Sequence, residues 1–240
     1  MSSDLDTVLR VTRTKAQAKA SYDRLSRFYD LLAGGFEQNL SSTALKRLDI
    51  RRGETVLEIG FGTGAGLKRM AEAVGGAGRV HGIDISSGML AASRRRLKKA
   101  GLEDRVELTC QDALKIPYAE NKFEAVFMSF ALELFDSPEI PAVLAEIKRV
   151  LKPNGRLGVV SMSKGNGASP ILRLYEWLHQ KLPQIADCRP IHVEGSIRQA
   201  GFAIQSKQRV GLFGLPVEIV IAAKQGTYLP AHVLWVPPIQ

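Results

Sequence analysis

From residue 53 onward, short apolar runs alternate with longer amphipathic stretches, and glycines, prolines and capping residues separate them. Short apolar runs of about four to eight residues are typical of buried strands, and the longer amphipathic stretches are typical of helices. A regular strand–helix alternation implies right-handed crossovers and an open parallel sheet with helices on both faces. The first five predicted strands lie within residues 54–60, 78–86, 105–113, 123–132 and 155–163.

The last two apolar runs, 202–211 and 215–224, are separated only by a short turn. Two strands this close cannot enclose a crossover helix, so we expect them to pair antiparallel. Two helices are predicted before them, an amphipathic one within 169–183 and a shorter one within 192–201. The sequence therefore predicts an α/β fold with a seven-stranded Rossmann-like sheet that is mostly parallel and ends in an antiparallel hairpin.

A glycine-rich loop, GFGTGAG at residues 60–66, follows the first predicted strand directly. The carboxyl end of a strand is where open α/β sheets bind ligands, and glycines let a ligand lie against the backbone amides. The spacing is wrong for a P-loop, and no Lys-Ser/Thr pair follows. The segment GFGTGA also satisfies the dinucleotide pattern G-x-G-x-x-G/A, so the glycines alone leave an NAD-dependent dehydrogenase open.

Three carboxylates at the predicted strand ends narrow the choice of ligand. Glu58 stands inside the first strand end, where it would repel a pyrophosphate but attract an ammonium. Asp84 ends the second strand and can accept hydrogen bonds from a ribose diol, and Asp112, after the third strand, can accept from an adenine amine. A dehydrogenase gives Glu58 and Asp112 no role. Together the three favour a cationic adenosine ligand that carries an amino acid, S-adenosylmethionine (SAM).

Residues 22 to about 163 resemble the class I SAM-dependent methyltransferases, and specifically the ubiquinone/menaquinone biosynthesis C-methyltransferase family and its relatives. The order and spacing of the matching segments are more specific than the glycine loop alone. The closing hairpin also fits that fold, so the resemblance covers nearly the whole domain. The matching segments are YDRLSRFYDLL, VLEIGFGTG, GIDISSGML, QDALKIPYAENKFEAVFMSFAL and EIKRVLKPNGRL.

The resemblance implies a role for each residue of the cofactor site. Glu58 and Gly60 would face the methionine end of SAM, and Asp84 its ribose. Asp112 would read the adenine edge, and Tyr29 would cover the methionine carboxylate from an N-terminal lid helix. The expected cofactor-binding residues are Tyr29, Glu58, Gly60, Phe61, Gly62, Thr63, Gly64, Asp84, Ile85, Asp112, Ala113 and Ser129.

Methyl transfer is an in-line displacement that needs mainly positioning, with a base where the nucleophile must lose a proton. The family has Ser129-Phe130 in common with this chain but usually carries a basic or amide pair where Glu133 stands. An acid there would hold an ammonium, which favours an amine or phosphatidylethanolamine N-methyltransferase as the alternative to a quinol-methylating enzyme. The candidates for the base are Tyr22, Glu133, His179 and His192.

Segment 164–200 is longer than a plain crossover, and we expect it to wall the acceptor pocket. Arg189 within it is a candidate for holding an anionic head group, or for a structural salt bridge. The expected apolar lining is Leu172, Tyr175, Trp177 and Leu178.

The net charge of +9 and the pI near 9.7 favour anionic partners. Nucleic acid is disfavoured, because no RNA-binding module is appended and the Asn/Asp-Pro-Pro-Tyr/Phe signature is absent. Residues 8–33 are basic with interspersed apolar residues, so they either contact an anionic membrane peripherally or pack onto the sheet with their cations solvated. No metal spacing, secretory signal or membrane span is found, which predicts a cytoplasmic protein, and a homodimer is left open.

The predicted organisation is an N-terminal lid at 1–50, a methyltransferase domain at 51–225 and a tail at 226–240. The predicted function is SAM-dependent transfer of a methyl group to a small or lipid-like apolar acceptor, a quinol first. A non-catalytic SAM-binding protein is the alternative from a different class.

Overall fold

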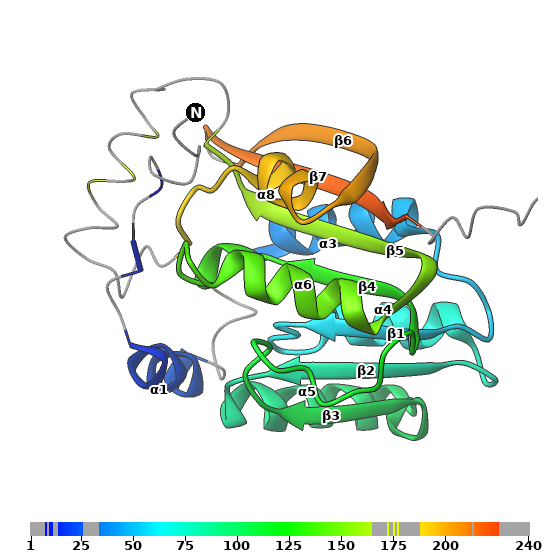
Figure 1. Ribbon diagram of the computed structural model, residues 1–240. Coiled ribbons are helices and arrows are strands. Elements are labelled where there is room, and N and C mark those ends of the chain that lie inside the picture. Colours follow the sequence, from blue (N-terminus) through cyan, green and yellow to red (C-terminus); the bar gives the residue numbers. More distant parts are fainter. Residues whose placement is uncertain are drawn as a thin grey trace, which may run out of the picture.

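The computed structural model describes residues 8, 10–11, 14–25, 34–164, 172, 175, 177, 188–212 and 214–225. The described part forms one seven-stranded sheet in the order β3-β2-β1-β4-β5-β7-β6 (Figure 1). Strands β1 to β5 run parallel, and β7 pairs antiparallel with both β5 and β6. The predicted fold class is therefore confirmed. The strands are β1 Thr55–Ile59, β2 Arg79–Asp84, β3 Val106–Cys110, β4 Phe123–Ser129, β5 Leu151–Met162, β6 Phe202–Leu212 and β7 Leu215–Lys224.

Helices cover both faces of this sheet (Figure 1). Helices α3, α4 and α5 pack on one face, and α6 and α8 pack on the other. Helix α1 lies against α5, beside the carboxyl ends of the strands. The helices are α1 Lys15–Leu25, α3 Gly34–Leu48, α4 Ala65–Val74, α5 Ser87–Ala100, α6 Ile140–Val150 and α8 Val193–Gln199, with short 3₁₀ turns η2 Glu103–Arg105 and η3 Leu132–Leu134.

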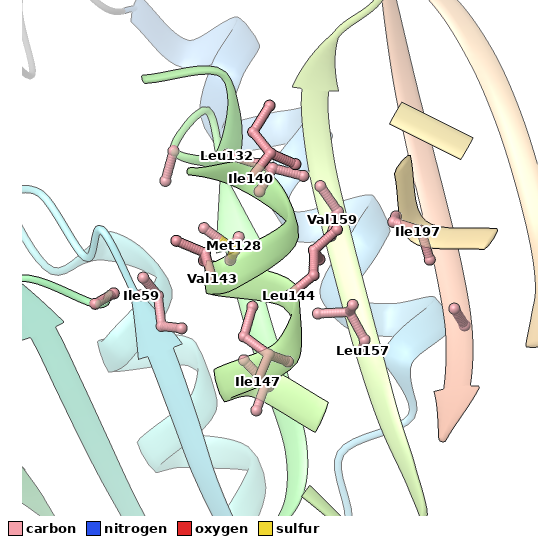
Figure 2. Packing of buried hydrophobic residues seen from close by; sticks show 14 of the residues in the cluster. Ile59, Met128, Leu132, Ile140, Val143, Leu144, Ile147, Leu157, Val159 and Ile197 are labelled. Carbon is pink, nitrogen blue, oxygen red and sulfur yellow. The ribbon is translucent and has the colours of Figure 1, made fainter. Parts of the chain in front are cut away.

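The alternation of side chains along the strands divides the core into two apolar layers. Leu57 and Ile59 of β1 join the layer beneath α6, whereas Val56 joins the layer beneath α3 and α4. Figure 2 shows how α6 turns one apolar stripe toward β4 and β5. Each large side chain buried in this way contributes roughly 1.5–3 kcal/mol. The stripe, at the spacing of one helix face, is Ile140, Val143, Leu144 and Ile147.

The N-terminal region, predicted as a lid over residues 1–50, divides into two parts. Helix α1 lies over the strand ends, but α3 packs on β5, β7 and α4 as part of the helical layer. Ala44 and Leu48 of α3 are fully buried in the core. The lid among the described residues is therefore confined to α1 and the residues just before it.

Local signals placed several element ends correctly and missed one. Ser86 is the N-cap of α5, since its Oγ accepts from the Met89 amide at 3.1 Å. Strand β5 begins at Leu151 rather than near residue 155. Leu151 pairs with Phe123 ahead of a register shift in β4, so Pro153 falls in an irregular stretch that needs no amide there. None of the helices in the described part combines the length and apolar character of a membrane span.

Candidate cofactor and acceptor site

The carboxyl ends of β1, β2, β3 and β4 converge on a cavity of about 350 Å³. The sheet order turns back between β1 and β4, and this topological switch point is where open α/β sheets leave a crevice. Helix α1 and segment 134–136 form the remaining walls. Of the residues predicted for the cofactor, the cavity is lined by Gly60, Gly62, Asp84, Ile85, Asp112, Ala113 and Ser129.

A smaller cavity of about 90 Å³ lies next to the larger one. The two share Gly60, Gly62, Ser129 and Phe130 in their walls. The smaller cavity brings in Glu58, Phe61 and Thr63 together with residues of α3 and α4. Gly64 lines neither cavity. It is the N-cap of α4, with φ +82°, and a side chain there would meet Ser93 at 2.8 Å, so this glycine serves the turn.

Glu58 is a buried acid with an unsatisfied oxygen. Its side chain is 3% exposed, and burial is the main cause that raises its pKa to about 8, followed by the charge of Asp84. The carboxyl accepts a hydrogen bond from the backbone amide of Leu67, in the first turn of α4. Its Oε2 has no hydrogen-bond partner in the described part of the chain. A cationic ligand would therefore be favoured beside this oxygen.

Asp84 is held at the end of β2 by backbone amides. Its Oδ2 accepts from the Gly62 amide at 3.0 Å and its Oδ1 from the Ser86 amide at 2.9 Å. Burial raises its pKa to about 6, against the lowering effect of these hydrogen bonds. The carboxylate is thus fixed between the glycine loop and the start of α5, on the wall of the larger cavity.

The wall between the two cavities contains a backbone outlier. Phe130 has φ +51°, a conformation that a bulky side chain rarely adopts and that persists only when its surroundings enforce it. Its amide donates to the Val160 carbonyl at 2.8 Å. The neighbouring Ser129 is tied to α3, since its Oγ lies 2.5 Å from the Ser41 Oγ. Such strain gathers at functional sites, which agrees with the position of this turn.

The N-terminal segment is bound to the rim of the cavity by charged groups. Lys15 Nζ lies 2.6 Å from Asp112 Oδ2 and 2.8 Å from Glu139 Oε1. Arg10 donates to both oxygens of Asp136, and this hydrogen bonding is the main cause that lowers the Asp136 pKa to about 2. Two cations of the predicted membrane-binding lid are therefore engaged in ion pairs with the rim.

Helix α1 is also connected directly to α5. Asp23 accepts from the Gly88 amide at 2.8 Å and from the Ser86 Oγ at 2.6 Å. The chemistry of the first turn of α5 thus involves a carboxylate from another helix, in the place where a helix N-terminus favours negative charge. Sequence reasoning missed these contacts, because no local pattern pairs residues 64 or more positions apart.

Comparison with known proteins adds to this geometry. Residues 56–155 match the family model described as a methyltransferase domain. The chain is 37% identical over 149 residues to the ubiquinone/menaquinone biosynthesis C-methyltransferase UbiE of Pseudomonas fluorescens, a match that covers 62% of this chain and only 56% of that protein. It is 34% identical over 174 residues to the demethylmenaquinone methyltransferase of Corynebacterium kroppenstedtii, covering 69% of this chain and 68% of that one. The chain belongs to the class I SAM-dependent methyltransferases.

Solved structures agree on the fold of this family. A SAM-dependent methyltransferase from Aquifex aeolicus matches with a TM-score of 0.57 and 26% identity, over 76% of this chain and 88% of that one. The [4+2]-cyclase SpnF matches with a TM-score of 0.72 and 22% identity, over 91% and 99%. The second match concerns the fold alone, and it belongs to a protein named for a different reaction.

The site of this methyltransferase fits SAM in charge and shape. The orphaned Glu58 oxygen suits the ammonium, and the fixed Asp84 carboxylate suits the ribose. The glycine loop leaves open space, since a side chain at Gly62 would meet no atom within 4 Å. In the described part of the chain, no cluster of His, Cys, Asp or Glu residues could hold a metal ion.

The predicted catalytic residues of the methyltransferase are only partly at the cavity. Tyr22 lines the larger cavity from α1. Glu133 is fully buried and lines neither cavity; its Oε1 accepts from the Met162 amide at 3.1 Å, and burial raises its pKa to about 7. The interpretation of Glu133 as a group that contacts the acceptor was therefore wrong. His192 caps α8 away from both cavities, and His179 and Tyr29 lie outside the described residues.

The insertion at 164–200 contributes less to the cavity than expected. Leu172, Tyr175 and Trp177 line neither cavity, and Trp177 is 55% exposed. Leu178 lies outside the described residues. Cys188 does line the larger cavity, and nothing in its sequence context indicated this.

Arg189 is fully buried, so it cannot meet an anionic head group at the surface. Its Nη1 donates to Ser137 Oγ at 3.1 Å and its Nη2 donates to the Phe135 carbonyl. Both partners belong to the chain that follows η3, next to the cavity wall at residues 134–136. Arg189 therefore connects the end of the insertion to the acceptor side of the site.

Proposed function

We propose that this protein transfers the methyl group of SAM to a small or lipid-like apolar acceptor of the quinol type. The observation that carries the proposal is the single larger cavity, in which Asp84 and Asp112 lie at one end and apolar residues lie at the other. SAM supplies an electrophilic methyl group on a sulfonium. The apolar end includes Val11, Ala18, Phe130, Ala131, Leu134 and Phe135.

The relatives support a quinol acceptor, because their names specify ubiquinone/menaquinone biosynthesis and demethylmenaquinone. The matched segment spans little more than half of the Pseudomonas relative, so the substrate of this chain is a proposal in its own right. The acids at the acceptor end are engaged, Asp136 by Arg10 and Glu139 by Lys15. A positively charged amine would therefore compete with cations of the chain, and Glu133 no longer supports that alternative.

The chain positions the acceptor more clearly than it activates it. Holding the ring against the methyl group lowers the barrier by orientation, which accounts for much of the catalysis of such displacements. Where the quinol must lose a proton, Tyr22 is the described candidate on the wall, and its role stays a proposal. A peripheral location at a membrane is proposed on the same basis as the lipid-like acceptor.

A transfer assay tests this function. The protein is incubated with SAM carrying a tritiated methyl group and either a demethylated naphthoquinol or phosphatidylethanolamine, and the organic phase is counted. We expect label in the naphthoquinol and none in the phospholipid. Label only in phosphatidylethanolamine would replace the quinol proposal. Undiminished SAM binding without transfer to either acceptor, or to a cell lipid extract, would favour a non-catalytic SAM-binding protein.

A further inference from the structure

The smaller cavity contains a cation that nothing in the description above uses. Arg69, on the second turn of α4, lines this cavity and is half-buried. Its Nη1 lies 3.4 Å from the Gln38 carbonyl of α3, a long contact for a hydrogen bond. Within the described residues no carboxylate lies within ion-pair distance of it. The adjacent Lys68 differs, because it pairs with Glu72 at 3.3 Å on the outer face of α4.

The same cavity contains a buried acid of opposite charge. Glu58 lines it with an oxygen that has no described partner, although the charge of Arg69 already helps to lower the Glu58 pKa against the larger effect of burial. A half-buried guanidinium and an orphaned carboxyl thus face a space of about 90 Å³. A group that presents both an anion and a cation would satisfy the two at once.

The smaller cavity is also continuous with the site already described. Gly60, Gly62, Ser129 and Phe130 belong to both walls, so one elongated ligand can pass the glycine loop. A side chain at Gly62 would point into open space rather than into protein atoms. The end of the ligand that lies beyond the loop is then the end opposite to Asp112, which stands on the far wall of the larger cavity.

We propose that the smaller cavity receives the α-amino-acid end of SAM, and that Arg69 binds its carboxylate while Glu58 faces its ammonium. This inference rests on the proposed function, because it concerns the same cofactor. Arg69 is a binding residue of this site that the glycine-loop pattern does not indicate. A guanidinium can grip a carboxylate through two parallel hydrogen bonds, which fixes the direction of the sulfonium as well as its affinity.

The test compares two ligands that differ only at this end. S-adenosylhomocysteine has the amino-acid end, and 5′-methylthioadenosine lacks it. Calorimetric titration of both into the wild type, Arg69→Met and Lys68→Met gives the fold-change for each. We expect Arg69→Met to weaken S-adenosylhomocysteine about 10- to 100-fold, the range for hydrogen bonds to a charged group, and to leave 5′-methylthioadenosine unchanged. Lys68→Met, on the same helix but paired outward, should change neither.

Equal weakening of both ligands by Arg69→Met would show that Arg69 only supports the fold, and unchanged binding of both would also overturn the proposal. Arg69→Lys, which keeps the charge but not the fork, should recover part of the loss for S-adenosylhomocysteine alone, and it replaces the methionine variant if that protein does not fold. A wild type that binds neither ligand would refute the proposed function itself. A wild type that binds both equally well would refute the subsite while leaving that function standing.

Discussion

The substitution Glu58→Gln should change how the stability of the ligand-free protein depends on pH. The pKa of Glu58 is raised to about 8, mainly by burial, whereas the group has its ordinary value of 4.5 in the unfolded chain. A buried acid with a raised pKa holds its proton in the folded state only. Its contribution to stability is therefore complete below pH 4.5 and is lost as the pH rises through 8.

The window from pH 6.5 to 8 separates this effect from others of opposite sign. His81 has a pKa lowered to about 4 by burial, so its contribution is gained between pH 4 and its ordinary 6.5 and is constant above that. Over the remaining 1.5 pH units Glu58 alone costs about 2 kcal/mol, at 1.36 kcal/mol per unit. For a domain of this size, that corresponds to a fall in Tm of roughly 4–8 °C.

The assay is urea or thermal unfolding of the wild type and Glu58→Gln at pH 6.5 and 8. We expect the wild type to lose about 2 kcal/mol more than the variant over this interval. Glu133, whose pKa is also raised, contributes equally to both proteins and cancels. Glu72→Gln, an exposed acid on α4, is the matched control and should follow the wild type. Parallel pH profiles for wild type and Glu58→Gln would refute the argument that a buried protonated acid lies behind the glycine loop.

Three further predictions concern the cofactor and the lid. Asp84→Ala should weaken SAM by about 1.5–3 kcal/mol in calorimetry, the range for hydrogen bonds to a charged acceptor, and an unchanged Kd in a folded variant would end the ribose assignment. Gly62→Val should fold with a Tm lowered only by the cost of φ +51°, about 1–2 kcal/mol, yet lose SAM; failure to fold would mean that this glycine serves only the turn. Sedimentation with anionic vesicles should show binding at low salt that falls as salt screens it, and no binding at low salt by a protein that still methylates would exclude the membrane contact.

The arrangement of the sheet was predictable because its causes are local. Apolar runs of strand length and a two-strand closing hairpin determine which segments pair, and the proximity of strand ends in a parallel sheet brings Asp84 and Asp112 to one cavity. Helix α3 was harder to place. It has only a weakly amphipathic sequence, and its burial results from contacts with β5 and β7, far along the chain.

The errors at the site have a common physical cause. Glu133 follows a strand that ends at the cavity, and its residue type indicates an exposed acid, yet the 3₁₀ turn η3 directs it into the interior, where the Met162 amide satisfies it. The ion pairs of Lys15 and Arg10 join residues about a hundred positions apart, so no sequence pattern specifies them. Burial and long-range pairing were therefore what the sequence could not supply.

A crystal structure with S-adenosylhomocysteine is the measurement that tests the central claim most directly. The two joined cavities predict that the ribose hydroxyls lie within hydrogen-bond distance of Asp84 and the adenine lies against Ile85 near Asp112. They also predict that the amino-acid end extends past Gly62 toward Glu58 and Arg69. A ligand whose ribose makes no contact with Asp84, or a protein that binds NAD in this cavity and not S-adenosylhomocysteine, would contradict the assignment of this site to SAM.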